Sequence, residues 1–256
     1  MDYISNNREV WDKKVDNNYV WTRPVNDDEV EDAKLGKWQI CLTPTKSVPM
    51  DWFPESLIGK KVLCLASGGG QQGPIMAAAG AEVTVFDNSE KQLGQDRYVA
   101  QRNNLSIKTV QGDMKDLSAF EDETFDFIVH PWSNCYVDTV IPVWNEAYRV
   151  LKKEGTLISG FANPIEYIFD LKELEQGGFV VRHSIPYSDL TSISEDELNE
   201  LVLNQDEGIC FGHSLYDQIQ GQIAAGFLIT GFYEDKGGSA LDQYIDSSIA
   251  TKAIKL

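Results

Sequence analysis

The 256-residue chain is long enough for one α/β domain with additional segments, and its 42% hydrophobic and 24% charged residues are ordinary for a globular protein. It carries 40 Asp and Glu against 22 Lys and Arg, a net charge of −18, and no basic run is longer than two residues. Because nucleic acids and anionic membrane surfaces are bound through clustered Lys and Arg, this balance disfavours both as partners.

Four cysteines lie far apart in the sequence, at positions 41, 64, 135 and 210. Their spacing is not that of metal ligands, so no metal site is expected, and isolated thiols are typical of a reducing compartment. The first residues lack the apolar core of a signal peptide, and no apolar run approaches the roughly 18 residues of a membrane span. We therefore expect a cytoplasmic protein.

Residues 1–57 are polar but rich in aromatic side chains, among them Trp21. Helix patterns occur at 5–15 and 27–37. The segment is too short and polar to fold as a domain of its own, so we expect it to pack as an arm across the main domain. Aromatic side chains in such an arm either anchor it or line a pocket, and the sequence leaves both functions open.

From residue 58 onward, short apolar runs alternate with helical patterns. The expected strands are 61–66, 82–86, 107–111, 125–130 and 155–161. The expected helices are 71–79, 89–103 and 140–151, with a short helix or turn at 115–120. This alternation predicts βαβ units and a doubly wound, mostly parallel sheet, in which ligands bind at the carboxyl ends of the strands.

Residues 162–213 interrupt the alternation. They contain an expected helix, a hairpin and an acidic helix, at 166–175, 179–187 and 195–203. A capping-box pattern from Ser214 to Asp217 then begins a helix that ends at Gly226, and two further strands follow at 227–233 and 249–254. We therefore interpret 58–161 and 214–256 as one seven-stranded α/β domain, and 162–213 as an inserted substrate cap.

A glycine-rich turn follows the first expected strand. Glycines there let the backbone approach a ligand closely, and the helix that comes next offers free N–H groups. Gly68, Gly70 and Gly73 formally match the dinucleotide fingerprint G-x-G-x-x-G, and Asp87 would fit the acidic ribose partner. The match is shifted by two residues from the strand end at Ala66, so an NAD(P)-dependent oxidoreductase stays only as an alternative.

Four segments carry a family resemblance: VLCLASGGGQQG, VTVFDNS, QGDM and FDFIVHPWSN. Together they resemble the class I S-adenosylmethionine-dependent methyltransferases, most closely the small-molecule branch that includes the ubiquinone and menaquinone biosynthesis type. The resemblance spans 58–161, and more loosely 214–256, and implies a Rossmann-like methyltransferase fold. The family turn is acidic-x-Gly-x-Gly-x-Gly, whereas this chain has Cys64 in place of the acidic residue and Ala66 in place of the first glycine.

The resemblance also implies a set of cofactor contacts. Asp87 would accept both ribose hydroxyls, because a carboxylate can accept two hydrogen bonds. The step after the third strand would hold the adenine, with a carboxylate on its amino group and an apolar side chain against the ring. The implied S-adenosylmethionine-binding residues are Ala66, Ser67, Gly68, Gly70, Asp87, Asn88, Gly112, Asp113, Met114 and His130.

The acceptor side is less specified by the sequence. His130 ends the fourth strand and His213 precedes the Ser214 cap, so both are candidates for a catalytic base. The candidate pocket residues are Trp21, Trp132, Asn134 and His213. In-line methyl transfer needs mainly alignment, and a base only where the acceptor must lose a proton. The expected function is methyl transfer to a small-molecule acceptor, and the departures at Cys64 and Ala66 leave open a protein that binds the cofactor without transfer.

Overall fold

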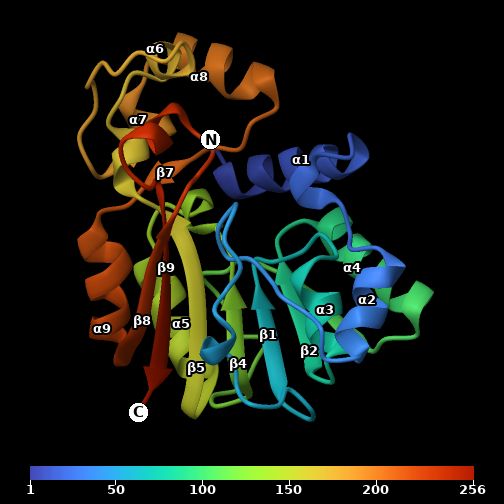
Figure 1. Ribbon diagram of the computed structural model, residues 1–256. Coiled ribbons are helices and arrows are strands. Elements are labelled where there is room, and N and C mark those ends of the chain that lie inside the picture. Colours follow the sequence, from blue (N-terminus) through green and yellow to red (C-terminus); the bar gives the residue numbers. More distant parts are fainter.

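The computed structural model describes the backbone of residues 1–256 and every side chain except that of Glu175. Its main sheet has seven strands in the order β3-β2-β1-β4-β5-β9-β8 (Figure 1). β9 is antiparallel to both of its neighbours, and the remaining pairs are parallel. The strands are Lys61–Leu65 (β1), Glu82–Asp87 (β2), Ile107–Gln111 (β3), Phe125–His130 (β4), Leu151–Ala162 (β5), Phe227–Asp235 (β8) and Ser248–Lys255 (β9). The predicted mostly parallel, seven-stranded α/β fold is confirmed.

Helices cover both faces of this sheet. α3 and α4 pack on one face, and α5 and α9 on the other (Figure 1). Their bounds are Gln72–Ala78 (α3), Glu90–Asn103 (α4), Ile141–Val150 (α5) and Gly221–Ala225 (α9), the last preceded by a π-helical turn at Tyr216–Gln220. The Ser89 hydroxyl accepts the Gln92 N–H at 3.1 Å, which is the expected N-cap of α4. No described helix combines the length and the apolar character that crossing a membrane would require.

The arm begins with two capped helices, α1 (Tyr3–Asp16) and α2 (Asp27–Lys34). α1 lies above the carboxyl ends of the parallel strands, beside the insertion (Figure 1). The Asp2 side chain caps α1, and Asn26 and Glu29 form a capping box at α2. α2 ends at Lys34, three residues before the expected end.

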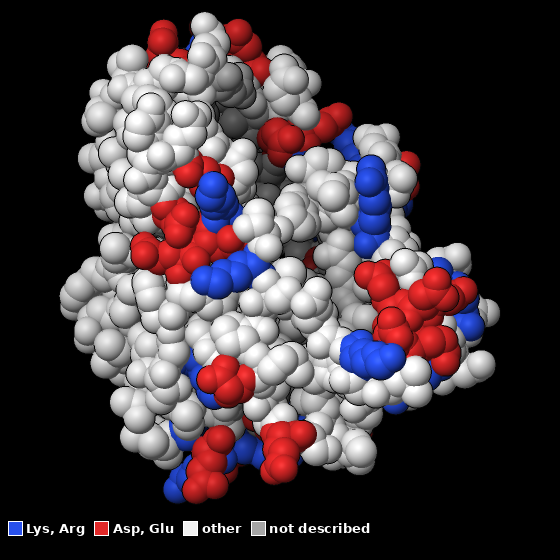
Figure 2. All heavy atoms as spheres, viewed as in Figure 1, with Lys and Arg blue, Asp and Glu red and all other residues white. Residues whose placement is uncertain are grey.

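Charges of both signs are mixed on the surface. On the face drawn in Figure 2, Lys and Arg side chains stand beside Asp and Glu rather than gathering into a basic patch. Many form ion pairs, such as Lys34 with Glu31 at 2.7 Å and Arg182 with Asp170 at 2.8 Å. This arrangement on that face agrees with the low expectation of a nucleic-acid partner.

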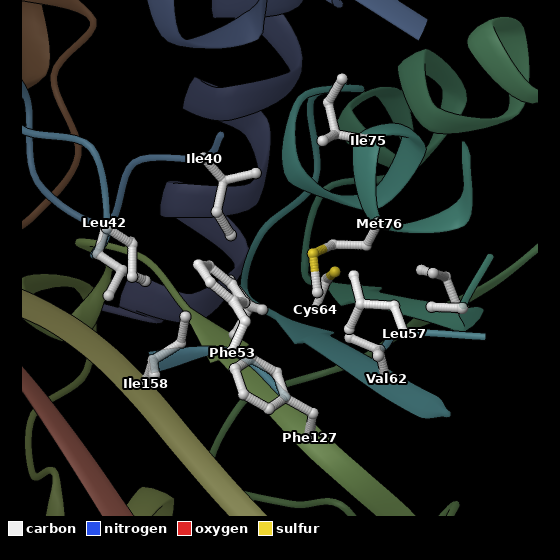
Figure 3. Packing of buried hydrophobic residues seen from close by; sticks show 14 of the residues in the cluster. Ile40, Leu42, Phe53, Leu57, Val62, Cys64, Ile75, Met76, Phe127 and Ile158 are labelled. Atoms are coloured by element: carbon white, nitrogen blue, oxygen red, sulfur yellow. The ribbon is translucent and has the colours of Figure 1, made fainter. Parts of the chain in front are cut away.

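The rest of the arm is anchored in the core. Ile40, Leu42 and Phe53 lie among side chains of the central strands (Figure 3). The Phe53 ring stacks on Phe127 with a centroid separation of 5.6 Å. Cys64 points into the same apolar cluster, where a thiol behaves as a small hydrophobe.

The insertion forms small elements around an apolar cluster of Val202, Ile209 and Phe211. Its elements are α6 (Leu171–Glu175), β6 (Tyr187–Ser188), α7 (Asp189–Ser192), α8 (Glu195–Leu201) and β7 (Phe211–Gly212). The predicted hairpin at 179–187 is wrong, because β6 pairs with β7 instead. Val180 and Val181 are 51% and 66% exposed, so a hairpin there would have no buried face to stabilise it.

The single helix expected at 166–175 is also wrong in detail. A 3-10 turn at Pro164–Tyr167 and α6 stand in its place. Asp170 separates them because its side chain accepts the Glu173 N–H at 3.2 Å and so starts a new helix.

Candidate functional site

A cavity of about 290 Å³ opens at the carboxyl ends of the parallel strands. One wall comes from the turns after β1, β2, β3 and β4, and the opposite wall from α1, the segment 41–44 and Glu207 of the insertion. This is where an α/β sheet of this topology binds ligands. The cavity brings together eight of the expected cofactor residues: Ala66, Ser67, Gly68, Asp87, Asn88, Gly112, Asp113 and Met114.

The glycine turn begins at a strained position. Ala66 has φ 47°, in the left-handed region where a residue with a Cβ is disfavoured, and its N–H donates to the Phe86 carbonyl at 2.7 Å. The next backbone amide, that of Gly68, donates to Asp87 Oδ2 at 2.9 Å. A Cβ on Gly68 would lie 2.7 Å from the Gln92 Cβ, so glycine is required by close approach of α4. The turn is therefore fixed by contacts to β2 and α4.

Asp87 stands at the centre of the strand-end wall. Besides the Gly68 amide, its carboxylate accepts the Ser89 N–H at 2.9 Å. Burial raises the pKa of Asp87 to about 6, while these amide hydrogen bonds act in the opposite direction. A carboxylate has about four lone-pair sites, so two amide bonds leave capacity for ligand hydroxyls. The side chain is therefore an anionic acceptor at neutral pH, facing the cavity.

The turn after β3 closes the same wall. Gly112 packs on the Phe86 ring so tightly that a Cβ there would lie 2.3 Å from the Phe86 Cζ. Asp113 caps the turn by accepting the Lys115 N–H at 3.0 Å, and Met114 packs against the apolar cluster below. The three residues place a carboxylate and a thioether side by side at the cavity edge.

Aromatic side chains dominate the opposite wall, namely Trp11, Tyr19, Trp21, Trp132 and Tyr136. Trp11 contacts Tyr136 edge to face with a centroid separation of 5.6 Å, so α1 packs directly on the segment after β4. The Trp132 N–H donates to the Leu42 carbonyl at 3.2 Å, which joins that segment to the arm. The wall is thus assembled from residues far apart in the sequence.

One ion pair connects the arm to the insertion across this wall. Lys14 is only 8% exposed, its ammonium lies 2.5 Å from Glu207 Oε2, and it sits over the Trp11 and Tyr19 rings at 5.2 and 4.6 Å from their centroids. Asn7 adds two bonds to Ile209, donating to its carbonyl at 3.0 Å and accepting its N–H at 2.7 Å. α1 is therefore clamped between the sheet and the insertion.

Comparison with known proteins identifies the family. A methyltransferase domain model matches residues 63–159. The uncharacterized methyltransferase YbaJ of Bacillus subtilis is 56% identical over 253 residues, covering 99% of this chain and 98% of that protein. The chain belongs to the class I S-adenosylmethionine-dependent methyltransferases. The methyltransferase uses S-adenosylmethionine as its cofactor.

More distant relatives match only the central part of the methyltransferase. Sterol 24-C-methyltransferase ERG6 of Saccharomyces cerevisiae is 33% identical over 101 residues, 38% of this chain and 26% of that protein. The ubiquinone biosynthesis O-methyltransferase of Actinobacillus pleuropneumoniae is 32% identical over 113 residues, 43% of this chain and 48% of that protein. These matches agree with the predicted resemblance of the cofactor half.

Solved structures share the fold at low sequence identity. An S-adenosylmethionine-dependent methyltransferase from Mesorhizobium loti has a TM-score of 0.61 at 16% identity, covering 80% of this chain and 94% of that one. Geranyl diphosphate C-methyltransferase from Streptomyces coelicolor has a TM-score of 0.59 at 12% identity, covering 100% and 99%. At such identities the likeness concerns the fold alone.

The two candidate catalytic histidines of the methyltransferase do not reach the cavity. His130 is fully buried, with Nδ1 donating to the Leu65 carbonyl at 2.9 Å and Nε2 lying 2.7 Å from Oδ1 of Asn134. His213 is buried behind Asn134 and donates from Nε2 to its carbonyl at 3.0 Å. Burial lowers the pKa of both histidines, which keeps them neutral. We correct the prediction: His130, Asn134 and His213 join β4 to the segment before α9 and do not line the cavity.

Gly70 is also corrected as a cavity residue. It has φ 73°, and a Cβ there would lie 2.8 Å from the Pro24 Cβ. Its carbonyl accepts the Val25 N–H at 2.9 Å, so the residue faces the arm. Glycine is needed at this position for the close approach of the arm to the turn.

Sequence reasoning missed most of the arm's contribution to the cavity. Asn7, Trp11 and Lys14 line it at helical spacing on one face of α1, and Cys41 and Thr43 line it from the extended segment. The 3.6-residue periodicity of α1 indicates that these side chains share a face. It does not indicate which part of the fold they cover, because the contacts span up to 200 residues of sequence.

Proposed function

We propose that this methyltransferase transfers the methyl group to a small-molecule acceptor held in the same cavity, by in-line displacement at the methyl carbon. The observation that carries the proposal is the continuity of the cavity, whose strand-end wall and aromatic wall face one space. Holding two reactants in one enclosed space can contribute roughly 7–11 kcal/mol toward the barrier. Alignment is therefore the main catalytic contribution that we assign to the protein.

The strand-end wall fits S-adenosylmethionine, whose sulfonium supplies the activated methyl group. Asp87 would accept the ribose hydroxyls, because its carboxylate faces the cavity and keeps free lone pairs beside the Gly68 and Ser89 amides. Asp113 and Met114 would hold the adenine, with Asn88 beside it. Ala66 and Ser67 line the part of the turn that would lie under the methionine portion.

The aromatic wall supports an acceptor with a flat or apolar body. Trp11, Trp21 and Trp132 present large apolar surfaces to the cavity, and binding sites of this type orient ligands with few polar groups. We propose that 162–213 acts as the substrate cap and 1–57 as the arm, because Glu207 and Lys14 close the cavity between them. Such closure keeps water from the reacting groups.

The thiols bear on the compartment in which the methyltransferase works. Cys41, Cys64, Cys135 and Cys210 are free thiols in the structure. Free thiols support our proposal of a reducing compartment, the cytoplasm.

The test is turnover of S-adenosylmethionine to S-adenosylhomocysteine, followed by mass spectrometry. The protein is incubated with aromatic and apolar acceptors that carry hydroxyl, amine or carbon nucleophiles, and in parallel with total RNA and with denatured protein. We expect product with one class of small acceptor and none with the macromolecules, and no turnover by Asp87→Ala at cofactor concentrations that saturate the wild type. Turnover on a macromolecule alone, or cofactor binding without turnover on any acceptor, would overturn the proposal.

A further inference from the structure

Asp96 is a buried carboxyl group directly beneath the glycine turn. It lies on α4, and its exposure to solvent is 0%. Its Oδ2 accepts the Gly69 N–H at 3.1 Å, while its Oδ1 has no hydrogen-bond partner among the described residues. A buried polar atom without a partner destabilises the fold, so the position calls for a compensating function.

The groups around Asp96 include no cation that pairs with it. Arg97 is adjacent, but its guanidinium donates to Glu90 at 2.5 Å and to Thr109 at 3.0 Å. Cys64 from β1 and Asp87 from β2 are the other titratable groups that influence this carboxyl or are influenced by it. The only groups that favour its anion besides Arg97 are the backbone amides of Gly69 and Gly70.

The two amides held by Asp96 belong to the residues that give the turn its shape. Gly69 and Gly70 have φ of 117° and 73°, two successive residues in the left-handed region. A carboxyl group that accepts both N–H groups fixes this pair of conformations, as anion-binding backbone concavities do. Gln92, which packs between Asp96 and the turn, lines the cavity, so a change at Asp96 would reach the cofactor wall through one layer of atoms.

We propose that Asp96 is a positioning residue for the cofactor turn, and that its negative charge favours the sulfonium cofactor over its uncharged thioether product. The carboxyl holds the Gly69 and Gly70 amides below the turn while the cofactor lies above it. S-adenosylmethionine carries a positive sulfur that S-adenosylhomocysteine lacks. An anion buried in a medium of low dielectric attracts that charge, so the ionised form of Asp96 discriminates between substrate and product.

The titration of Asp96 provides the means of measuring this discrimination. Burial raises the pKa of Asp96 to about 8, so the carboxyl is neutral in the folded protein below that pH and ionised above it. The two ligands share the same adenosine and amino-acid groups. The ratio of their dissociation constants therefore cancels the titration of those shared groups and isolates the effect of the sulfur charge.

The experiment is calorimetric titration of both ligands into the full-length protein between pH 6 and 9.5. In the wild type, we expect the ratio of the S-adenosylhomocysteine Kd to the S-adenosylmethionine Kd to rise roughly three- to thirtyfold as the pH passes through about 8. Asp96→Asn, which keeps an oxygen for the Gly69 amide but has no charge, is expected to give a ratio that does not change with pH. A wild-type ratio that stays constant overturns the charge effect, even if the variant fails to fold.

Two control variants separate this effect from loss of charge or of stability elsewhere. Glu90→Gln removes an exposed carboxylate from the same helix, and Asp189→Asn removes a buried carboxyl of raised pKa from the insertion. Both are expected to keep the pH-dependent ratio of the wild type. If either abolishes it, the assignment to Asp96 is wrong.

The positioning function has its own measurement. In Asp96→Ala, amide hydrogen exchange at Gly69 and Gly70 is expected to accelerate, and both ligands are expected to bind less tightly. Unchanged exchange at these two amides overturns the positioning function. The inference rests on the cofactor occupying the strand-end wall: a wild-type protein that binds neither ligand refutes that placement, whereas binding with a constant ratio refutes only the function of the Asp96 charge.

Discussion

The two walls of the cavity are built in different ways. The strand-end wall consists of short turns after β1, β2 and β3, in which backbone amides and two carboxylates lie within 50 residues of one another. The aromatic wall joins α1, the segment 41–44, the turn after β4 and Glu207, which lie up to about 200 residues apart. The first wall depends on backbone geometry and the second on packing of distant side chains. We expect substitutions in the first to affect the cofactor and those in the second to affect the acceptor.

The largest expected effect is on cofactor affinity when Asp87 is replaced by alanine. The substitution removes the acceptor for the ribose hydroxyls and frees the Gly68 amide that shapes the turn. Hydrogen bonds to charged groups contribute about 1.5–3 kcal/mol each, so we expect the Kd for S-adenosylmethionine to rise about 10- to 100-fold in calorimetry. Asp116→Ala, which removes an exposed carboxylate after β3, is the control and should leave the Kd unchanged. Equal affinity of Asp87→Ala and wild type would contradict the ribose contact.

A glycine pair tests whether the arm is anchored on the turn. Gly70 and Gly59 have nearly the same φ, 73° and 70°, but a Cβ on Gly70 would meet Pro24 at 2.8 Å and one on Gly59 would meet nothing within 4 Å. Both alanine variants incur the conformational cost of about 1–2 kcal/mol. Gly70→Ala should lose a further amount of about 1–3 kcal/mol through overpacking, measured by urea unfolding. Equal losses at the two positions would show that the arm moves away from the turn at no cost.

The buried histidines should behave as structural residues. His130→Gln and His213→Gln each disrupt buried hydrogen bonds, so we expect losses of about 1–3 kcal/mol in the free energy of unfolding. Because neither ring reaches the cavity, the pH profile of kcat for the folded variants should match that of the wild type. Loss of a titration step from that profile in either variant would restore that histidine as a catalytic base.

The smallest expected effect is at the ion pair between arm and insertion. Glu207 is half exposed, so the pair with Lys14 contributes little by charge alone, and the main loss in Lys14→Met is the closure over the aromatic rings. We expect the acceptor KM to rise by less than about tenfold with an unchanged cofactor Kd. Lys13→Met is a matched control, since Lys13 pairs with Asp206 one position earlier but does not line the cavity. An equal effect of both variants would exclude a specific function of Lys14 in closure.

The contrast between the walls also explains what the sequence predicts. The strands, the Ser89 cap and the placement of Asp87 and Asp113 at strand ends follow from local patterns, because a parallel sheet aligns the ends of its strands at one edge. His130 was misassigned because a strand-end position does not reveal which face a side chain takes, and this ring turns toward Asn134. Strand β6 finds its partner in β7, and no local pattern shows a pairing across the insertion.

The most direct measurement is a crystal structure of the protein with S-adenosylhomocysteine. The account predicts that both ribose hydroxyls lie within hydrogen-bonding distance of the Asp87 carboxylate, roughly 2.5–3.2 Å, and that the thioether sulfur points toward the aromatic wall. An adenosine bound away from Asp87, or a sulfur facing away from Trp132 and Trp21, would contradict the division of the cavity into a cofactor wall and an acceptor wall.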